Sequence, residues 1–89
     1  MTEFRFAVNV LPKDGILDPQ GRAVEGSLPH LGVDGVSHVR VGRRVELAVE
    51  AGTESEARAT VERLASEVFS NPLIEQFEVE LNRPVGAAR

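Results

Sequence analysis

The chain has 89 residues, a net charge of −4 and no cysteine, so it predicts one small domain with a thin core and excludes disulfides, thiolate metal sites and thiol nucleophiles. It has no basic stripe and no Trp or Tyr to stack on bases, which argues against nucleic-acid binding. No apolar run approaches the ~20 residues that span a bilayer, so we expect a soluble, cytoplasmic protein without a membrane partner.

The first predicted elements are a strand over residues 4–11 and a helix that follows it. In the strand, large apolar residues alternate with others at a period of two. Asp18 and Pro19 predict the helix start, because the carboxylate can accept first-turn N–H groups and Pro fits the first helical position. We expect the helix to stop at Gly32, with a kinked last turn or an early end, since Pro29 is a poor helix residue.

Residues 36–50 predict one long strand that bends near Gly42. Its apolar residues keep an odd-numbered phase: Val39, Val41, Val45, Leu47 and Val49. A two-residue turn at Gly42-Arg43 would set charged residues opposite apolar ones. A three-residue loop over 42–44 would restore apolar pairs, but it places Arg44 where Gly is favoured. A strand of this length overhangs a small domain, and an overhanging edge tends to pair, so a homodimer is expected.

The segment after residue 50 predicts a second helix and a third strand. Thr53 and Glu56 form a capping box that starts a second helix, and residues 76–81 predict a strand with one acidic face. The order βαβαβ predicts an α+β fold with an antiparallel sheet, both helices on one face, a long bent central strand, and a relation to the ferredoxin-like split unit. We expect residues 1–82 to form one domain and residues 83–89 a flexible C-terminal tail.

No group of side chains has the spacing of an active site, a cofactor site or a metal site. His30 and His38 lack a neighbouring carboxylate or second ligand, and we interpret both as surface residues. The glycines near Asp18 match no phosphate-binding fingerprint. From the residues alone, we expect an acidic, dimeric α+β domain, and its function is not indicated.

The cluster Arg40, Arg43 and Arg44 has two interpretations. It could form a clamp for a phosphate or carboxylate group. Alternatively, these arginines pair with acidic residues such as those of the last strand, across the sheet or across a subunit boundary. We favour the second interpretation, because Gly42 would let another chain approach closely.

Several segments together resemble the PurS family, the small subunits of phosphoribosylformylglycinamidine (FGAM) synthase in purine biosynthesis. The resemblance covers about residues 3–81 and is specific as a combination, although each piece alone is weak. The matching segments are GILDPQG at residues 15–21, AVE at 23–25, LG at 31–32, VRVG at 39–42, NPLIE at 71–75 and FEVEL at 77–81.

The resemblance implies a noncatalytic subunit of a carbon–nitrogen ligase with glutamine as amido donor. In that family a glutaminase subunit releases ammonia, and a large synthetase subunit uses ATP and Mg to turn an amide into an amidine. The small subunit, a homodimer or dimer of dimers, joins the two and supports ammonia transfer. It binds no cofactor itself.

Carried over to this chain, the resemblance implies a set of interface residues. They are Asp18, Pro19, Gln20, Gly21, Arg40, Gly42, Arg43, Arg44, Asn71 and Pro72. The alternative that stays open is a free-standing ferredoxin-like regulatory module that binds a small metabolite, an analogy at the level of the fold only.

Overall fold

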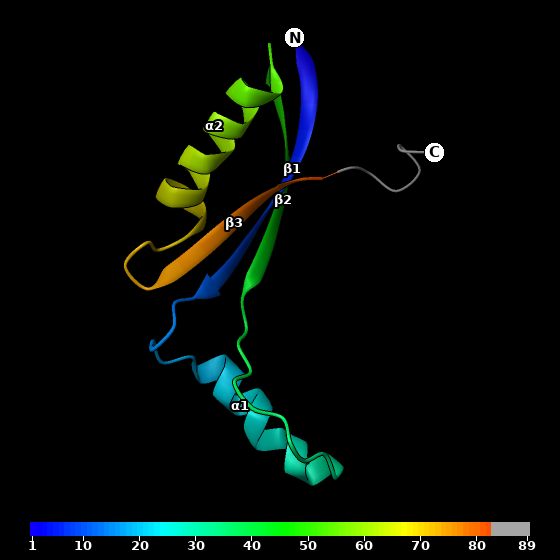
Figure 1. Cartoon of the computed structure of the whole chain (residues 1–89), viewed down its shortest axis with the longest axis vertical. Coiled ribbons are helices and arrows are strands. Elements are labelled where there is room, and N and C mark those ends of the chain that lie inside the picture. The colour runs from blue at the N-terminus through cyan, green and yellow to red at the C-terminus, as the bar shows by residue number, and fades with distance from the viewer. Residues whose placement is uncertain (83–89) are drawn as a thin grey trace.

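The computed structural model describes residues 1–82, which form three strands and two helices (Figure 1). In chain order these are β1 (Thr2–Pro12), α1 (Pro19–Ser27), the 3₁₀ turn η1 (Leu28–Leu31), β2 (Arg43–Ala51), α2 (Glu54–Leu64), the π-helical turn η2 (Ala65–Phe69) and β3 (Glu75–Leu81). The predicted α+β class and βαβαβ order are confirmed. The tail predicted at residues 83–89 lies outside the described residues. Within those residues, neither helix is long and apolar enough to cross a membrane.

The three strands form one antiparallel sheet in the order β2-β1-β3. Phe6 of the central strand β1 lies opposite Leu47 of β2 and Leu81 of β3. Because side chains alternate across a strand, this register places the apolar residues of all three strands on one face. The predicted antiparallel sheet and its apolar alternation are confirmed.

Helix α2 covers the apolar face of the sheet. Ala57 and Val61 of α2 and Ala65 of η2 are fully buried, and they pack into one cluster with the β1 residues Phe6, Val8 and Val10. The helix begins as predicted, since the Glu56 N–H donates to Thr53 Oγ1 at 3.1 Å. The small residues of α2 let the helix approach the sheet closely, so the hydrophobic core lies between α2 and β1.

Helix α1 does not share this face, so the prediction that both helices cover one face is wrong for α1. Figure 1 shows α1 beyond the end of the sheet, where β1 ends and β2 begins. The helix packs along the returning chain of residues 33–42 instead of the sheet, because its start is hydrogen-bonded to that segment. We call residues 19–42 the arm. As predicted, α1 ends early, at Ser27, and a 3₁₀ turn leads to Gly32 in the left-handed conformation, φ +75°.

The strand predicted over residues 36–50 is shorter than expected. Strand β2 starts at Arg43, opposite Val10, and residues 33–42 have no regular secondary structure. The β1–β2 ladder stops at Val10, and β1 itself ends two residues later at Pro12, so no strand lies beside residues 33–40 to pair with them. The chain nevertheless does not reverse at Gly42 but runs from the arm straight into β2, which excludes the hairpin turn (Figure 1).

The arm makes the molecule unusually extended. Its principal extents are 52 × 36 × 14 Å and its radius of gyration is 16.8 Å, whereas a globular chain of this length has about 12 Å. Large apolar side chains of the arm are exposed: Val24, Leu31, Val33 and Val36. The arm therefore has no hydrophobic core of its own within the described chain.

Candidate functional site

The candidate site is the joint between the sheet and the arm, which we define as residues 13–21, residues 38–43 and Glu75. Asp18 is the central residue of this joint. Its Oδ1 accepts the Gly21 N–H at 3.0 Å, which caps α1 as predicted, and its Oδ2 accepts the Val41 N–H at 2.9 Å. These hydrogen bonds, from Gly21 first and then Val41, hold the pKa of the Asp18 carboxyl below its usual value. One charged side chain thus fastens the helix start to the returning chain.

Two glycines allow the backbone segments of the joint to approach closely. A Cβ on Gly21 would overlap the carbonyl oxygen of Val39, and a Cβ on Gly42 would overlap the carbonyl oxygen of Val10. Glu25 adds a further contact, because its Oε2 accepts the Val39 N–H at 3.2 Å. Two backbone donors of the returning chain, the N–H groups of Val39 and Val41, are therefore satisfied by carboxylates of α1 and its cap, in place of a neighbouring strand.

An open groove of about 600 Å³ runs across the joint. The structure brings five of the predicted interface residues together in its lining: Asp18, Pro19, Gln20, Gly42 and Arg43. The rest of the lining is mostly apolar: Pro12, Ile16, Leu17, Val41 and Ile74, with Glu75. Leu17 is 67% exposed, so the groove presents an apolar side chain to solvent beside a fixed ion pair.

Arg43 and Glu75 form that ion pair at one end of the groove. The guanidinium group donates two hydrogen bonds to the Glu75 carboxylate, at 2.8 and 2.9 Å, and a third to the Phe69 carbonyl. Glu75 also accepts the Asn71 N–H at 2.7 Å. Arg43 and then Asn71 lower the pKa of Glu75, and Glu75 raises that of Arg43. The pair ties the start of β2 to the start of β3 across β1.

The other predicted residues are placed around the joint or away from it. Asn71 reaches the site only through Glu75, and Pro72 lies beside it in the loop before β3 without lining the groove. Arg44 lies on the sheet face opposite α2, where it pairs with Glu80 at 2.7 Å and Glu46 at 3.0 Å. Pairing with acidic residues, the favoured interpretation of the arginine cluster, is therefore confirmed for Arg43 and Arg44.

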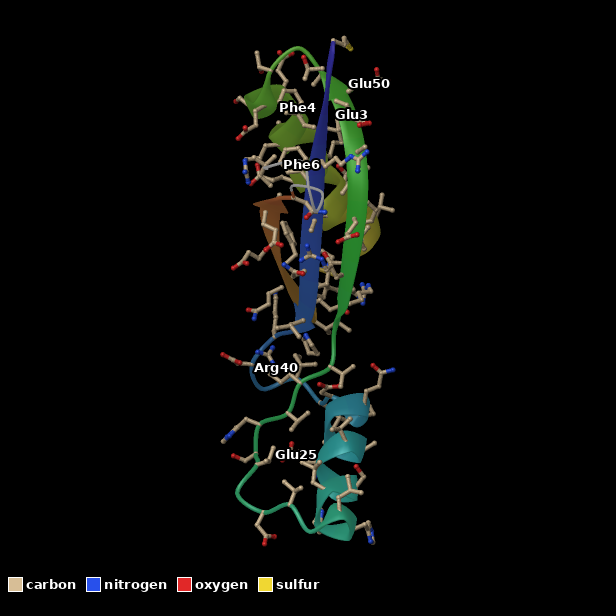
Figure 2. The ribbon with its side chains drawn as sticks, turned by 90° about the vertical axis from the view of Figure 1, so that its right-hand side faces the viewer. Glu3, Phe4, Phe6, Glu25, Arg40 and Glu50 are labelled. Carbon is tan, nitrogen blue, oxygen red and sulfur yellow. The ribbon has the colours of Figure 1, made fainter. Side chains whose placement is uncertain are left out.

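Arg40 forms a longer ion pair than Arg43 and Arg44 do. Among the described residues, its only ion pair is with Asp14, at 3.4 Å, and it lies at the level of the loop between β1 and α1 (Figure 2). Neither His30 nor His38 joins a metal-binding group, and among residues 1–82 no three His, Asp or Glu side chains are grouped to hold a metal ion.

Sequence reasoning missed five residues that contribute to the joint or its groove. Glu25 and the N–H groups of Val39 and Val41 are hydrogen-bonded across the arm, and Leu17 and Ile74 supply apolar groove lining. No local pattern marks Glu25, because its partner lies 14 residues away. Leu17 could have been found, since an apolar residue directly before a helix cap often contacts a neighbouring surface.

Comparison with known proteins gives consistent results. Residues 5–83 match the PurS family, described as phosphoribosylformylglycinamidine (FGAM) synthase. The chain is similar to the phosphoribosylformylglycinamidine synthase subunit PurS of Synechocystis sp., with 36% identity over 80 residues, 90% of this chain and 80% of that protein. It is also 36% identical to the subunit of the same name from Mycobacterium leprae over 75 residues, 84% of this chain and 91% of that protein.

Solved structures agree with the sequence matches. The purS subunit of phosphoribosylformylglycinamidine synthase from Thermotoga maritima superposes with a TM-score of 0.82 at 30% identity, over 91% of this chain and 93% of that chain. A chain in the structure of PurLQS from Thermotoga maritima gives a TM-score of 0.83 at 30% identity, over 92% of this chain and 100% of that chain.

Proposed function

Since this chain belongs to the PurS family of FGAM synthase small subunits in purine biosynthesis, we propose that it bridges the glutaminase and synthetase subunits of that ATP-dependent ligase and supports ammonia transfer between them. The chain itself is assigned no catalytic residue and no cofactor in this proposal. Its relative in the PurLQS structure is found together with PurL and PurQ, which makes a complex with two larger subunits the expected context. The cytoplasm is the compartment we assign to it.

The observation that carries this proposal is the projecting arm. A helix and its returning chain extend beyond the sheet, and the exposed fractions of Val24, Leu31, Val33 and Val36 range from 41 to 73%. Apolar surface of this kind is stabilised by removal from water, at about 25 cal/mol per Å². A segment with so little internal packing is best explained as one that is covered in an assembly.

The same arm supports self-association. Strand β2 is an edge strand of the sheet, and the returning chain leads into it without a turn. An exposed edge next to uncovered apolar side chains favours pairing with a second copy. We propose a homodimer, or a dimer of dimers, as the unit that meets the larger subunits.

The joint groove is the surface we assign to one of the larger subunits. It combines exposed Leu17 and Ile74 with a polar rim at Gln20 and Arg43, a composition typical of an interface with an apolar centre. Asp18 and the two close-approach glycines hold the arm at a set angle to the sheet. A bridging subunit needs such a rigid joint, because two partners must be held in register for ammonia to pass.

Reconstitution tests the bridging role. The chain is mixed with the glutaminase and synthetase subunits of its own complex, and amidine formation is measured with glutamine and, separately, with free ammonia. We expect the glutamine-dependent rate to require the chain, whereas the ammonia-dependent rate should change little. Equal glutamine-dependent rates with and without the chain would contradict the proposal.

A matched pair of variants tests the groove. Leu17 and Val68 are 67 and 66% exposed, but only Leu17 lines the groove. Leu17→Asp should reduce capture of a larger subunit by the chain in pull-down, while Val68→Asp should not. Equal capture by both variants would remove the groove from the interface.

A further inference from the structure

A second hollow, of about 230 Å³, lies on the joint and is lined by basic side chains. Lys13 comes from the loop after β1, Arg22 from the second turn of α1, and Arg40 from the returning chain. Figure 2 shows Arg40 where this returning chain passes the loop between β1 and α1. His38, Asp14 and Asp18 complete the charged and titratable lining. Three separate segments thus bring cationic groups to one small space, in a chain whose net charge is −4.

These cations have few partners. Among residues 1–82, the side chains of Lys13 and Arg22 take part in no ion pair or hydrogen bond, whereas Arg43 and Arg44 each have carboxylate partners. Both oxygens of Asp18 are occupied by backbone N–H groups. The hollow therefore holds more donors than its own carboxylates can satisfy.

Arg40 is the least satisfied of these donors. Within residues 1–82, its Nη2 is buried and has no acceptor, and its Nη1 forms an ion pair only with Asp14, a side chain that is 97% exposed. An exposed ion pair at 3.4 Å contributes little, so Arg40 can exchange Asp14 for another anion at small cost. A buried donor without an acceptor is unfavourable, and an incoming oxyanion would provide the missing acceptor.

The backbone of His38, which also lines the hollow, has an uncommon conformation. His38 is the one non-glycine residue with positive φ, 58°, in the described chain, and its Nδ1 lies 3.1 Å from Ser37 Oγ. Such backbone geometry is uncommon outside glycine and is found often at ligand sites. His38 and Arg40, which flank Val39 in the sequence, both line this hollow.

We propose that this basic hollow binds the phosphate group of a small phosphorylated metabolite. Cationic donors from three segments suit the tetrahedral oxygens of a phosphate better than a planar carboxylate, which one guanidinium group satisfies. Of the three arginines considered above for a phosphate clamp, only Arg40 lines this hollow. The site goes beyond the bridging function and does not depend on it, because all of its lining residues belong to a single copy of the chain.

Titration of the intact chain tests the site. Amide ¹H–¹⁵N spectra are recorded with inorganic phosphate, with ribose 5-phosphate and with acetate, at constant ionic strength set by NaCl. We expect saturable shifts at residues 13–18, 22 and 38–40 with both phosphates, with ribose 5-phosphate binding at least as tightly, and no saturation with acetate.

Variants with the same charge change separate a site from general attraction. Arg22→Gln removes a donor of the hollow and should weaken phosphate binding about tenfold, the effect of one charge-assisted hydrogen bond. Lys13→Gln should act in the same direction and serves as the second variant if Arg22→Gln alters the spectrum broadly. Arg63→Gln removes a charge on α2, where Arg63 pairs with Glu67, and should leave binding unchanged.

Several results would overturn the proposal. Shifts that rise linearly with phosphate, that spread over all basic residues, or that appear equally with acetate indicate ionic screening in place of a site. Equal weakening by Arg22→Gln and Arg63→Gln has the same meaning. Saturable binding of inorganic phosphate without ribose 5-phosphate binding would exclude a phosphorylated metabolite. The bridging role is tested separately by amidine formation in the reconstituted complex. A failure of the phosphate site would therefore leave the bridging proposal standing, and the reverse also holds.

Discussion

Substituting Gly42 by Ala tests the close approach at the joint most directly. The added Cβ would overlap the Val10 carbonyl oxygen and lie 3.0 Å from the Val10 carbonyl carbon and 2.7 Å from Leu11 Cδ2. Leu11 can rotate away, but the Val10 carbonyl belongs to the central strand and cannot move without shifting the register partner of Arg43. The strain must therefore be absorbed by the backbone of β1 or of the arm.

The expected cost of Gly42→Ala follows from this geometry. Forcing an extra carbon into tightly packed surroundings costs typically 1–3 kcal/mol, and contact with backbone places this site at about 2–3 kcal/mol. A domain of this size has a free energy of unfolding of about 4–13 kcal/mol, so the loss is a large share. It corresponds to a decrease of about 10–20 °C in the melting temperature.

A matched substitution provides the control. Gly26 lies in α1, and a Cβ there meets nothing within 4 Å. Gly26→Ala should therefore stabilise the chain by about 0.5–1 kcal/mol, because Ala has the higher helix propensity. Both variants are melted by circular dichroism at one fixed protomer concentration, since association also shifts the melting temperature. If Gly42→Ala melts within about 2 °C of the parent chain, the close approach between the arm and β1 does not constrain this fold.

Two electrostatic predictions complete the set. The pKa of Asp18 is lowered by its hydrogen bonds, so its contribution to stability is present above its unfolded pKa of about 3.9 and lost as the pH falls through the folded pKa. Asp18→Asn keeps the cap but presents an amide donor to one of the two N–H groups, so we expect a lower urea midpoint at pH 7 and a difference that shrinks below about pH 4; a constant difference would contradict this account. In a double-mutant cycle, Arg43→Gln and Glu75→Gln should couple more strongly than Arg63→Gln and Glu67→Gln, whose exposed helical pair is typical of about 0.3–0.5 kcal/mol. Equal coupling in both pairs would show that the Arg43–Glu75 pair does not fasten the sheet.

The local elements could be predicted from sequence because their signals lie within a few residues. Asp18 caps α1, Thr53 caps α2, and Gly32 ends the 3₁₀ turn with positive φ. The period-two alternation of the strands also fixes which side chains face a core. These patterns depend on backbone geometry that neighbouring residues alone impose.

Some of the site residues could also be predicted from sequence, because their signals are local. The residues next to Asp18 and Gly42 in the sequence mark them as a helix cap and a bend, and the structure brings both to one groove. Their partners could not be predicted, because the Val41 N–H lies 23 residues from Asp18 and Glu75 lies 32 residues from Arg43. Treating Arg40, Arg43 and Arg44 as one cluster was wrong in geometry, since the two faces of the sheet and the arm separate them.

By itself, the amino-acid sequence determined the order of the elements, the helix caps, the apolar face of each strand and the absence of a turn at Gly42. Only the tertiary structure decided where β2 begins and where α1 lies. A strand exists only as far as a neighbour supplies hydrogen-bond partners, and β1 ends at Pro12. Beyond that point the valine alternation continues without a ladder, and the carboxylates of Asp18 and Glu25 accept the N–H groups of Val41 and Val39 instead.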